Sequence, residues 1–147
     1  MAQSSLDQIN IVARDLDATV AFYRILGVQL RDPIRTEGGE AFHANSMPAS
    51  GASLEADSER FARVWNRGWE SEAELAGRIV IGLRVADRAA VDRLAEEVVR
   101  SGYRLLQPPY DAFWGARYAI VEDPDGIAVG LMSPADDAHR SPPPDFS

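Results

Sequence analysis

The chain offers few side chains for metal or nucleophile chemistry. Its 147 residues include two histidines, His43 and His139, no cysteine, and fifteen arginines but no lysine. Thiolate nucleophiles, disulfides and cysteine-ligated metal sites are therefore excluded, as is Schiff-base chemistry at lysine. Two imidazoles also cannot build a histidine-rich metal site within one chain. The chemistry that remains rests on carboxylates, amides, arginines and aromatic rings.

The balance of charge is acidic, with 15 basic against 23 acidic residues and a formal net charge of -8. Nucleic-acid binding needs a basic stripe, and no arginine cluster supplies one. An acidic protein attracts cationic small molecules instead. The first ten residues lack the features of a signal peptide, and no segment approaches the roughly 20 apolar residues of a membrane span. We therefore expect a cytoplasmic protein with no nucleic-acid or membrane partner.

One pattern of elements occurs twice and must position these groups. Residues 8–13 alternate in apolar character, Asp15 follows as a helix N-cap candidate, and the predicted helix ends at Gly27. Residues 80–85 repeat the strand, and residues 87–102 repeat the cap, an amphipathic stripe and the closing glycine. The chain therefore contains a duplicated strand-to-helix unit.

Three further strands are expected after each helix. They are predicted at residues 28–34, 41–45 and 51–55, and again at 103–107, 116–121 and 126–130. The sequence thus predicts an α+β fold of two βαβββ modules, about 5–57 and 77–133, within a single domain of residues 1–133.

Two segments lie outside the modules. The connecting segment, residues 58–76, places Phe61, Val64, Trp65 and Trp69 near helical spacing, so we expect a short amphipathic helix there. Residues 134–147 form a polar, proline-rich tail that we expect to be peripheral or disordered.

A family resemblance rests on the order of several short motifs. They are Asp7–Val12, Asp15-Leu16, Phe22-Tyr23, Leu26-Gly27, Trp114–Arg117 and Asp123–Gly126. Within a duplicated unit they resemble the vicinal oxygen chelate superfamily, which includes glyoxalase I, extradiol dioxygenases, fosfomycin-inactivating enzymes and bleomycin-resistance proteins. The resemblance implies that the modules form a cup-shaped, curved mixed sheet, and that the chain is a homodimer.

The resemblance also implies where metal ligands would lie, on the first and last strand of each module. The matching positions hold Gln8, Glu55, Val80 and Gly130. Because valine and glycine side chains donate nothing to a metal, a divalent metal is disfavoured and we expect no cofactor. His43 could join the site only if it pointed inward, where its neighbour Phe42 competes for that direction; otherwise it is a structural histidine. His139 lies in the tail and is a weaker candidate than His43 for a ligand or catalytic role.

Strand alternation assigns side chains to the cup. Small residues at Gly82, Ala128 and Gly130 would create space for a ligand. Glu55 and Arg84 either pair with each other or meet a charged ligand group, and Arg117 faces either the cavity or a salt-bridge partner. Trp114 is expected near the cup opening, where its ring could stack on a ligand. The candidate ligand-binding residues are Gln8, Asn10, Glu55, Val80, Arg84, Trp114, Arg117, Gly130 and Met132.

Three functions are compatible with these residues. The first is a metal-independent protein of the bleomycin-resistance type that binds a hydrophobic or cationic small molecule in the cup. The second is an enzyme of the same superfamily, a lyase, isomerase or dioxygenase, that uses Gln8, Glu55 and a displaced ligand. The third is a structural or regulatory module whose cup is filled by its own side chains.

Overall fold

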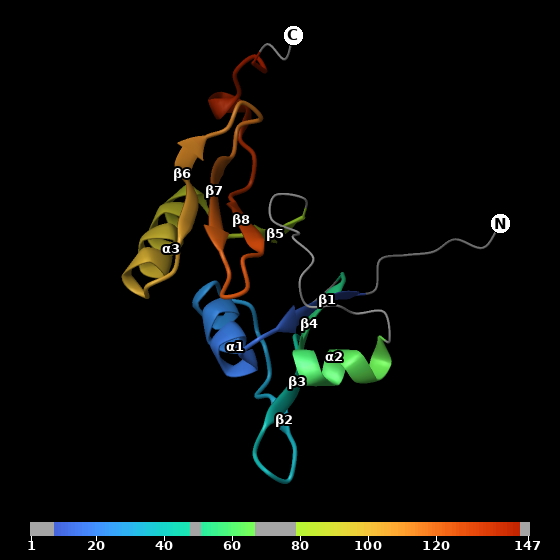
Figure 1. The fold of residues 1–147 in the computed structure, drawn as a ribbon. Coiled ribbons are helices and arrows are strands. Elements are labelled where there is room, and N and C mark those ends of the chain that lie inside the picture. Colours follow the sequence, from blue (N-terminus) through green and yellow to red (C-terminus); the bar gives the residue numbers. More distant parts are fainter. Residues whose placement is uncertain (1–7, 48–50, 67–78, 145–147) are drawn as a thin grey trace, which may run out of the picture. The chain divides into compact units, whose positions relative to one another are not determined.

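Two four-stranded sheets dominate a computed structural model that describes residues 8–47, 51–66 and 79–144. The chain divides into two compact units, residues 1–74 and 75–147 (Figure 1). Each unit has the order strand, helix, strand, strand, strand, so the predicted α+β fold of two βαβββ modules is confirmed.

In the first unit a mixed four-stranded sheet packs against the helix α1. Its strands lie in the order β1-β4-β3-β2, with β1 parallel to β4 and the other pairs antiparallel. A second helix follows the last strand. The elements are β1 (Gln8–Ala13), α1 (Leu16–Ile25), β2 (Ile34–Arg35), β3 (Ala41–Asn45), β4 (Ser53–Ser58) and α2 (Glu59–Trp65).

The second unit repeats this topology. Its strands lie in the order β5-β8-β7-β6, again with one parallel pair, β5 and β8. The helix α3 lies along β6 and β7 (Figure 1). The elements are β5 (Val80–Arg84), α3 (Arg88–Arg100), β6 (Leu105–Asp111), β7 (Arg117–Glu122), β8 (Ala128–Met132) and a short 3-10 helix, Asp137–His139.

The predicted helix boundaries have clear local causes. The Asp15 carboxylate accepts a hydrogen bond from the Ala18 backbone N–H at 3.0 Å, and Asp87 accepts one from Ala90 at 2.7 Å. Both aspartates therefore satisfy an N–H that the first helical turn leaves without a partner. At the other end, Gly102 takes φ of +89°, a left-handed conformation that favours glycine.

Each unit buries one face of its sheet against its helix. In the first unit Ile11, Ala13 and Ala56 are buried, and in the second Val121, Val129 and Leu131 are buried. Because strand side chains alternate, their sequence neighbours lie on the opposite face. The predicted phase of β1 and β5 is therefore confirmed, and the candidate site residues of these strands lie away from the core.

Two expected elements need adjustment. The strand expected at 28–34 is reduced to β2, preceded only by an isolated bridge between Leu30 and Ser46, because Pro33 has no N–H to give a ladder. The connecting helix exists as α2, whereas Trp69 lies outside the described residues.

The tail is peripheral but not without structure. Its backbone pairs with the loop before β7, through Asp136 N–H to the Gly115 carbonyl and Ser141 N–H to the Phe113 carbonyl. Most of its described residues are exposed. The proline-rich composition concealed this docking because the contacts are made by backbone groups, which composition does not reveal.

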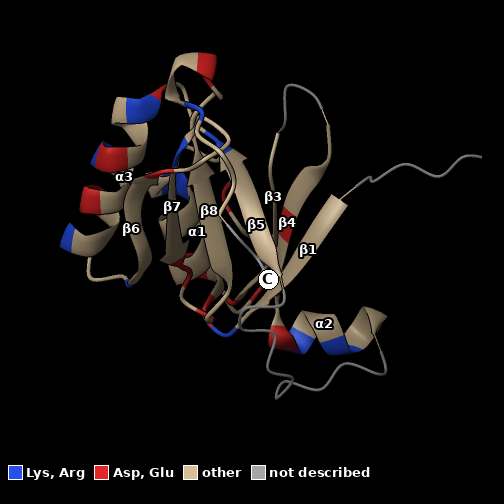
Figure 2. Cartoon of the chain, turned by 90° about the horizontal axis from the view of Figure 1, so that it is seen from above, with Lys and Arg blue, Asp and Glu red and all other residues tan. Residues whose placement is uncertain are grey.

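Charged residues of both signs lie along α2 and α3 (Figure 2). Such mixed helix surfaces form local ion pairs, as between Arg100 and Glu96, and make no basic stripe. Among the described helices, none has the length and apolar composition to cross a membrane.

Candidate functional site

The polar groups of the first unit gather on the sheet face opposite the buried core. We call this the polar face, defined by Gln8, Asn10, His43, Glu55 and Asp57. Cross-strand register brings them together: Asn10 pairs with Glu55, and Asp57 pairs with His43. Directly opposed residues of neighbouring strands lie close enough for their side chains to interact.

A buried carboxylate lies at the centre of the polar face. Asp57 is 2% exposed, and each of its two oxygens has a partner. Oδ1 lies 2.6 Å from His43 Nδ1, and Oδ2 accepts a hydrogen bond from Asn10 Nδ2 at 3.0 Å. Buried carboxylates persist in proteins when they are paired in this way. Three residues from three strands are therefore fixed in one connected arrangement.

A hollow of about 240 Å³ opens at these residues. The His43 ring contacts the Phe61 ring edge-to-face, with centroids 6.2 Å apart. Two carboxylates and two aromatic rings therefore meet in the hollow beside one imidazole. It is lined by Gln8, Asn10, His43, Glu55, Asp57, Phe61 and Trp65.

Two polar groups here retain capacity for further hydrogen bonds. The Asn10 side-chain oxygen is buried and accepts no hydrogen bond from the part of the chain that the structure describes. Glu55 accepts one from the Ser53 hydroxyl, at 3.3 Å. Within the described part of the chain, most of the hydrogen-bond acceptor capacity of the Glu55 carboxylate is therefore unused.

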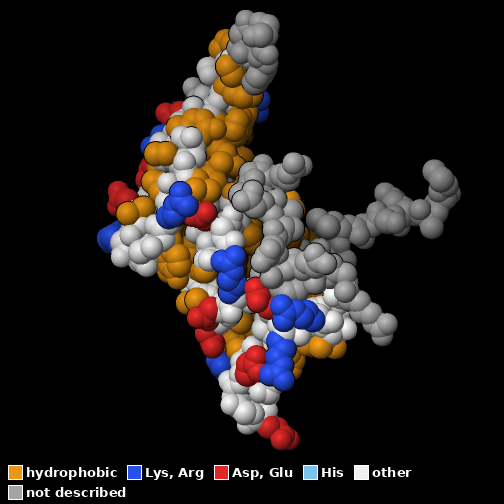
Figure 3. Space-filling view, viewed as in Figure 1, with side chains coloured by type: hydrophobic (Ala, Val, Ile, Leu, Met, Phe, Trp, Pro, Cys, Tyr) orange, Lys and Arg blue, Asp and Glu red, His pale blue; other side chains and the backbone are white. Residues whose placement is uncertain are grey.

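The second unit carries aromatic rather than polar groups on the corresponding face. We call this the aromatic face, defined by Arg84, Tyr110, Tyr118, Gly130 and Met132. Register aligns Tyr110, Tyr118, Met132 and Arg84 in one row across β6, β7, β8 and β5. Figure 3 shows hydrophobic side chains gathered along this unit.

The Tyr118 ring covers Gly130. A Cβ atom placed on Gly130 would lie 2.6 Å from Tyr118 Oη and 2.9 Å from Cε2. Since carbon atoms pack at about 3.5–4.0 Å, the ring occupies the space that a side chain at Gly130 would need. The register partner of Gly130 on β5, Gly82, has nothing within 4 Å of the same point.

Aromatic rings surround Tyr118 on two sides. Its centroid lies 5.7 Å from that of Trp114 and 6.0 Å from that of Tyr110, both edge-to-face. Trp114 in turn contacts Phe113 at 5.1 Å. Burial, with a smaller contribution from Tyr110, raises the pKa of the Tyr118 phenol, which therefore stays neutral near pH 7 and keeps an O–H that can donate a hydrogen bond to a ligand.

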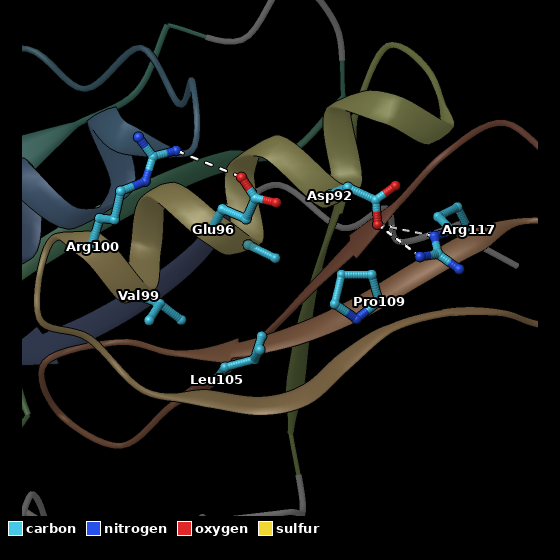
Figure 4. Close-up of a pocket in the computed structure, with 8 residues that line it drawn as sticks. Asp92, Glu96, Val99, Arg100, Leu105, Pro109 and Arg117 are labelled. Carbon is cyan, nitrogen blue, oxygen red and sulfur yellow. Dashed lines mark hydrogen bonds and ion pairs between the residues drawn. The ribbon is translucent and has the colours of Figure 1, made fainter.

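A larger hollow, about 540 Å³, lies on the other side of the second sheet, between α3 and β6 (Figure 4). Its charged groups are already paired: Arg117 bonds Asp92 at 2.8 Å, and Arg100 lies 3.8 Å from Glu96. The Asp92 hydrogen bond raises the pKa of Arg117, which therefore stays charged. Internally paired charges leave little for a ligand, so we do not place the site here.

Comparison with known proteins identifies the family. The family model described as the Glyoxalase/Bleomycin resistance protein/Dioxygenase superfamily matches residues 5–131. The chain belongs to this superfamily. A comparison with curated proteins gave no match.

Solved structures of the family share the fold. A glyoxalase/bleomycin resistance protein/dioxygenase family enzyme from Burkholderia phytofirmans has a TM-score of 0.73 at 21% identity, covering 88% of this chain and 98% of that one. A glyoxalase-related enzyme from Fulvimarina pelagi has a TM-score of 0.70 at 20% identity, covering 90% and 89%. The lactoylglutathione lyase from Agrobacterium tumefaciens has a TM-score of 0.61 at 16% identity, covering 90% and 96%. Such identities support the shared architecture alone.

The metal site that the family resemblance implies does not fit these residues. Val80 is 45% exposed and apolar, and the space over Gly130 is filled by Tyr118. Only Gln8 and Glu55, in the first unit, have donor atoms. Among the described residues no group of three or more His, Asp and Glu side chains is arranged to hold a metal ion. The residues at these four positions therefore do not complete the metal site that the resemblance implies.

The sequence-predicted residues fall into separate groups. Gln8, Asn10 and Glu55 come together on the polar face, and Val80, Arg84 and Met132 lie on the second sheet's face away from α3. Arg84 donates a hydrogen bond to the Ser133 carbonyl at 2.9 Å. The two alternatives given for Arg84, a pair with Glu55 or contact with a charged ligand group, both stay predictions.

One candidate position, Gly130, differs from expectation, and the contacts of two others are now defined. Gly130 is buried beneath Tyr118 and creates no open space. Arg117 points toward α3, where it bonds Asp92, so of its two alternatives the salt-bridge partner is the one observed (Figure 4). Trp114 is half-buried against Tyr118 rather than free.

Three residues that sequence reasoning passed over or discounted enter these sites. His43 lies on the polar face and not with its neighbour Phe42. Asp57 could have been found by alternation, since it lies two positions beyond Glu55 on the same strand face. Tyr118 could have been found likewise, from the buried phase of Ala119 and Val121.

Proposed function

We propose that the protein binds a hydrophobic small molecule on its aromatic face without the help of a metal ion. The observation that carries this proposal is the row of rings around Tyr118 at the position where the family resemblance places a metal ligand. Rings such as Trp114 and Tyr118 offer large, rigid contact surfaces for a flat ligand. The neutral phenol adds one directed hydrogen bond.

The charge of the aromatic face selects among ligands. Its defining residues include one charged side chain, Arg84, which is exposed. A cation on this face would meet like charge, whereas a neutral or weakly acidic ring system would not. A cationic ligand fits the polar face better, where Glu55, Asp57 and Trp65 line the hollow.

A fluorescence titration with three dyes tests this assignment. The probes are N-phenyl-1-naphthylamine as the neutral compound, anilinonaphthalene sulfonate as the anion and acridine orange as the cation. We expect saturable binding of the neutral dye, weakened about tenfold, or roughly 1.4 kcal/mol, by Trp114→Ala. Trp65→Ala, which removes a ring of the hollow in the other unit, is the comparison variant and should lower the affinity for the neutral dye much less than Trp114→Ala.

Other outcomes would redirect or reject the proposal. Tightest binding by acridine orange, weakened by Trp65→Ala and not by Trp114→Ala, would move the site to the polar face. No saturable response to any dye would reject small-molecule binding at the aromatic face. We also propose that the protein is cytoplasmic and, from the family resemblance, that it is a homodimer. Sedimentation equilibrium measures its oligomeric state directly.

The second candidate function is catalysis with a divalent metal held by Gln8, Glu55 and a displaced ligand. Glu55 favours it, because its carboxylate is bonded only to the Ser53 hydroxyl among described partners. Metal analysis of the purified protein separates the two functions: one equivalent of a divalent ion, lost in Glu55→Gln, would support the enzyme.

A further inference from the structure

The polar face contains an arrangement that the proposed binding function does not use. His43, Asp57 and Asn10 are joined by two hydrogen bonds, of 2.6 and 3.0 Å, and come from β3, β4 and β1. We propose that His43 is a metal-independent general base that takes a proton from a flat, uncharged or cationic molecule in the first unit's hollow.

The hydrogen bonds define the tautomer of His43. An ionised carboxylate can only accept, so the ring nitrogen that faces Asp57, Nδ1, carries the proton. In the neutral ring the lone pair then lies on Nε2. Asn10 donates to the second carboxylate oxygen and holds Asp57 in place. A carboxylate that orients a histidine and stabilises its protonated form is the arrangement used by catalytic histidines.

Burial separates the roles of the two partners. The Asp57 side chain is 3% exposed, whereas that of His43 is 22% exposed and lines the hollow. The carboxylate therefore acts only through the imidazole, and the imidazole is the group that a bound molecule can touch. Asp57 is a positioning residue and His43 the base.

The lining of the hollow indicates what His43 would act on. Among the described residues that line the hollow there is no serine, threonine or cysteine, so none of them offers the base a hydroxyl or thiol nucleophile to activate. Phe61 and Trp65 supply ring surfaces, which suit a flat apolar molecule. Glu55 and Asp57 make the lining acidic, which disfavours anions. The fitting substrate class is a planar carbon acid.

A generic probe of this class is 5-nitrobenzisoxazole. The base removes its one acidic ring C–H proton, which goes to Nε2 of His43. The C–H electron pair completes a C≡N bond while the N–O bond breaks, and the oxygen leaves with the electron pair of the N–O bond as a coloured phenolate. The reaction needs no oxidant, reductant or metal.

The experiment measures the rate of phenolate release by the full chain in the presence of a chelator. We expect His43→Ala to lower kcat/KM about 100-fold, as for loss of a general base, and added imidazole to restore part of it. His139→Ala removes the other histidine, which pairs with Asp136 in the tail, and should leave the rate unchanged.

Two further variants assign the roles. Asp57→Asn should lower kcat at least tenfold with little change in KM, and imidazole should not restore it, because His43 is present but poorly oriented. Glu55→Gln changes a lining residue and should lower kcat/KM far less than His43→Ala does, because its carboxylate is not the base. Urea midpoints identify any variant whose loss comes from unfolding, and rescue of His43→Ala requires a folded hollow.

Three results would overturn the proposal. One is a wild-type rate no faster than that of free imidazole at equal concentration. Another is an unchanged rate in His43→Ala, or an equal loss in His139→Ala. The third is loss of activity in Glu55→Gln with retention in His43→Ala, which would make Glu55 the base. None of these outcomes depends on dye binding by the aromatic face.

Discussion

Gly130 and Gly82 are register partners on neighbouring strands, and they predict opposite responses to one added methyl group. At Gly130, the new Cβ would lie 2.6, 2.9 and 3.1 Å from three atoms of the Tyr118 ring. Ordinary carbon contacts are about 3.5–4.0 Å, so the ring must move by about 1 Å. Trp114 and Tyr110 hold that ring on two sides, at 5.7 and 6.0 Å between centroids. The clash therefore cannot relax freely.

Overpacking of this kind costs about 1–3 kcal/mol. We expect Gly130→Ala to lower the free energy of unfolding by about 2 kcal/mol, and the melting temperature by about 4–8 °C. Gly82→Ala meets nothing within 4 Å and should change stability by less than about 0.5 kcal/mol, or stabilise slightly by restricting the unfolded chain. Urea denaturation followed by circular dichroism measures both.

A double-mutant cycle isolates the cause. With Tyr118→Ala in place, the added methyl has room, so Gly130→Ala should then cost nothing or stabilise. Equal costs in the presence and absence of the Tyr118 ring would refute the reasoning, as would a neutral Gly130→Ala in the wild-type background. Either result would show that the ring does not occupy the space over Gly130.

Three other predictions follow from particular contacts. Asp57→Ala leaves the donors of His43 and Asn10 without their acceptor and should cost about 1–3 kcal/mol by urea denaturation; a cost near zero would mean that the carboxylate is not buried between them. Asp15→Ala and Asp87→Ala each remove an N-cap and should each cost about 1 kcal/mol, whereas Asp15→Ser should cost much less. The Ala138 backbone N–H and His139 lower the pKa of Asp136 below its usual 3.8. The ionised carboxylate therefore stabilises the docked tail. This stabilisation is present above pH 3.8 and is lost as the pH falls below that value. The protection of the Ser141 amide from hydrogen exchange, taken relative to the intrinsic rate at each pH, should fall below about pH 4, and protection without this acid step would contradict the assignment.

The repeated elements could be predicted from the sequence because their signals are local. Asp15, Asp87 and Gly102 act within a few residues, and strand alternation needs only the next neighbours to define a phase. The faces of β1 and β5 followed from that phase. The sequence therefore predicts that Gln8, Asn10 and Glu55 share one sheet face, and the polar face brings these three side chains together.

The remaining site residues depend on contacts between distant segments. The pairing of β3 with β4 decides whether His43 or Phe42 faces the polar side. In that pairing His43 lies opposite Asp57 and forms a hydrogen bond with its carboxylate. Gly130 was read as empty space because the residue that fills it, Tyr118, lies on another strand. Arg117 had two alternatives, and only the position of Asp92 on α3 distinguishes them.

Binding without a metal is the central claim, and one measurement tests it most directly. The affinity for N-phenyl-1-naphthylamine is determined before and after exhaustive chelation of the protein. The proposed aromatic site predicts the same dissociation constant in both samples, because no described group at Val80, Gly130 or Tyr118 needs an ion to form the ring surface. Loss of binding on chelation, restored by one equivalent of a divalent ion, would contradict the claim.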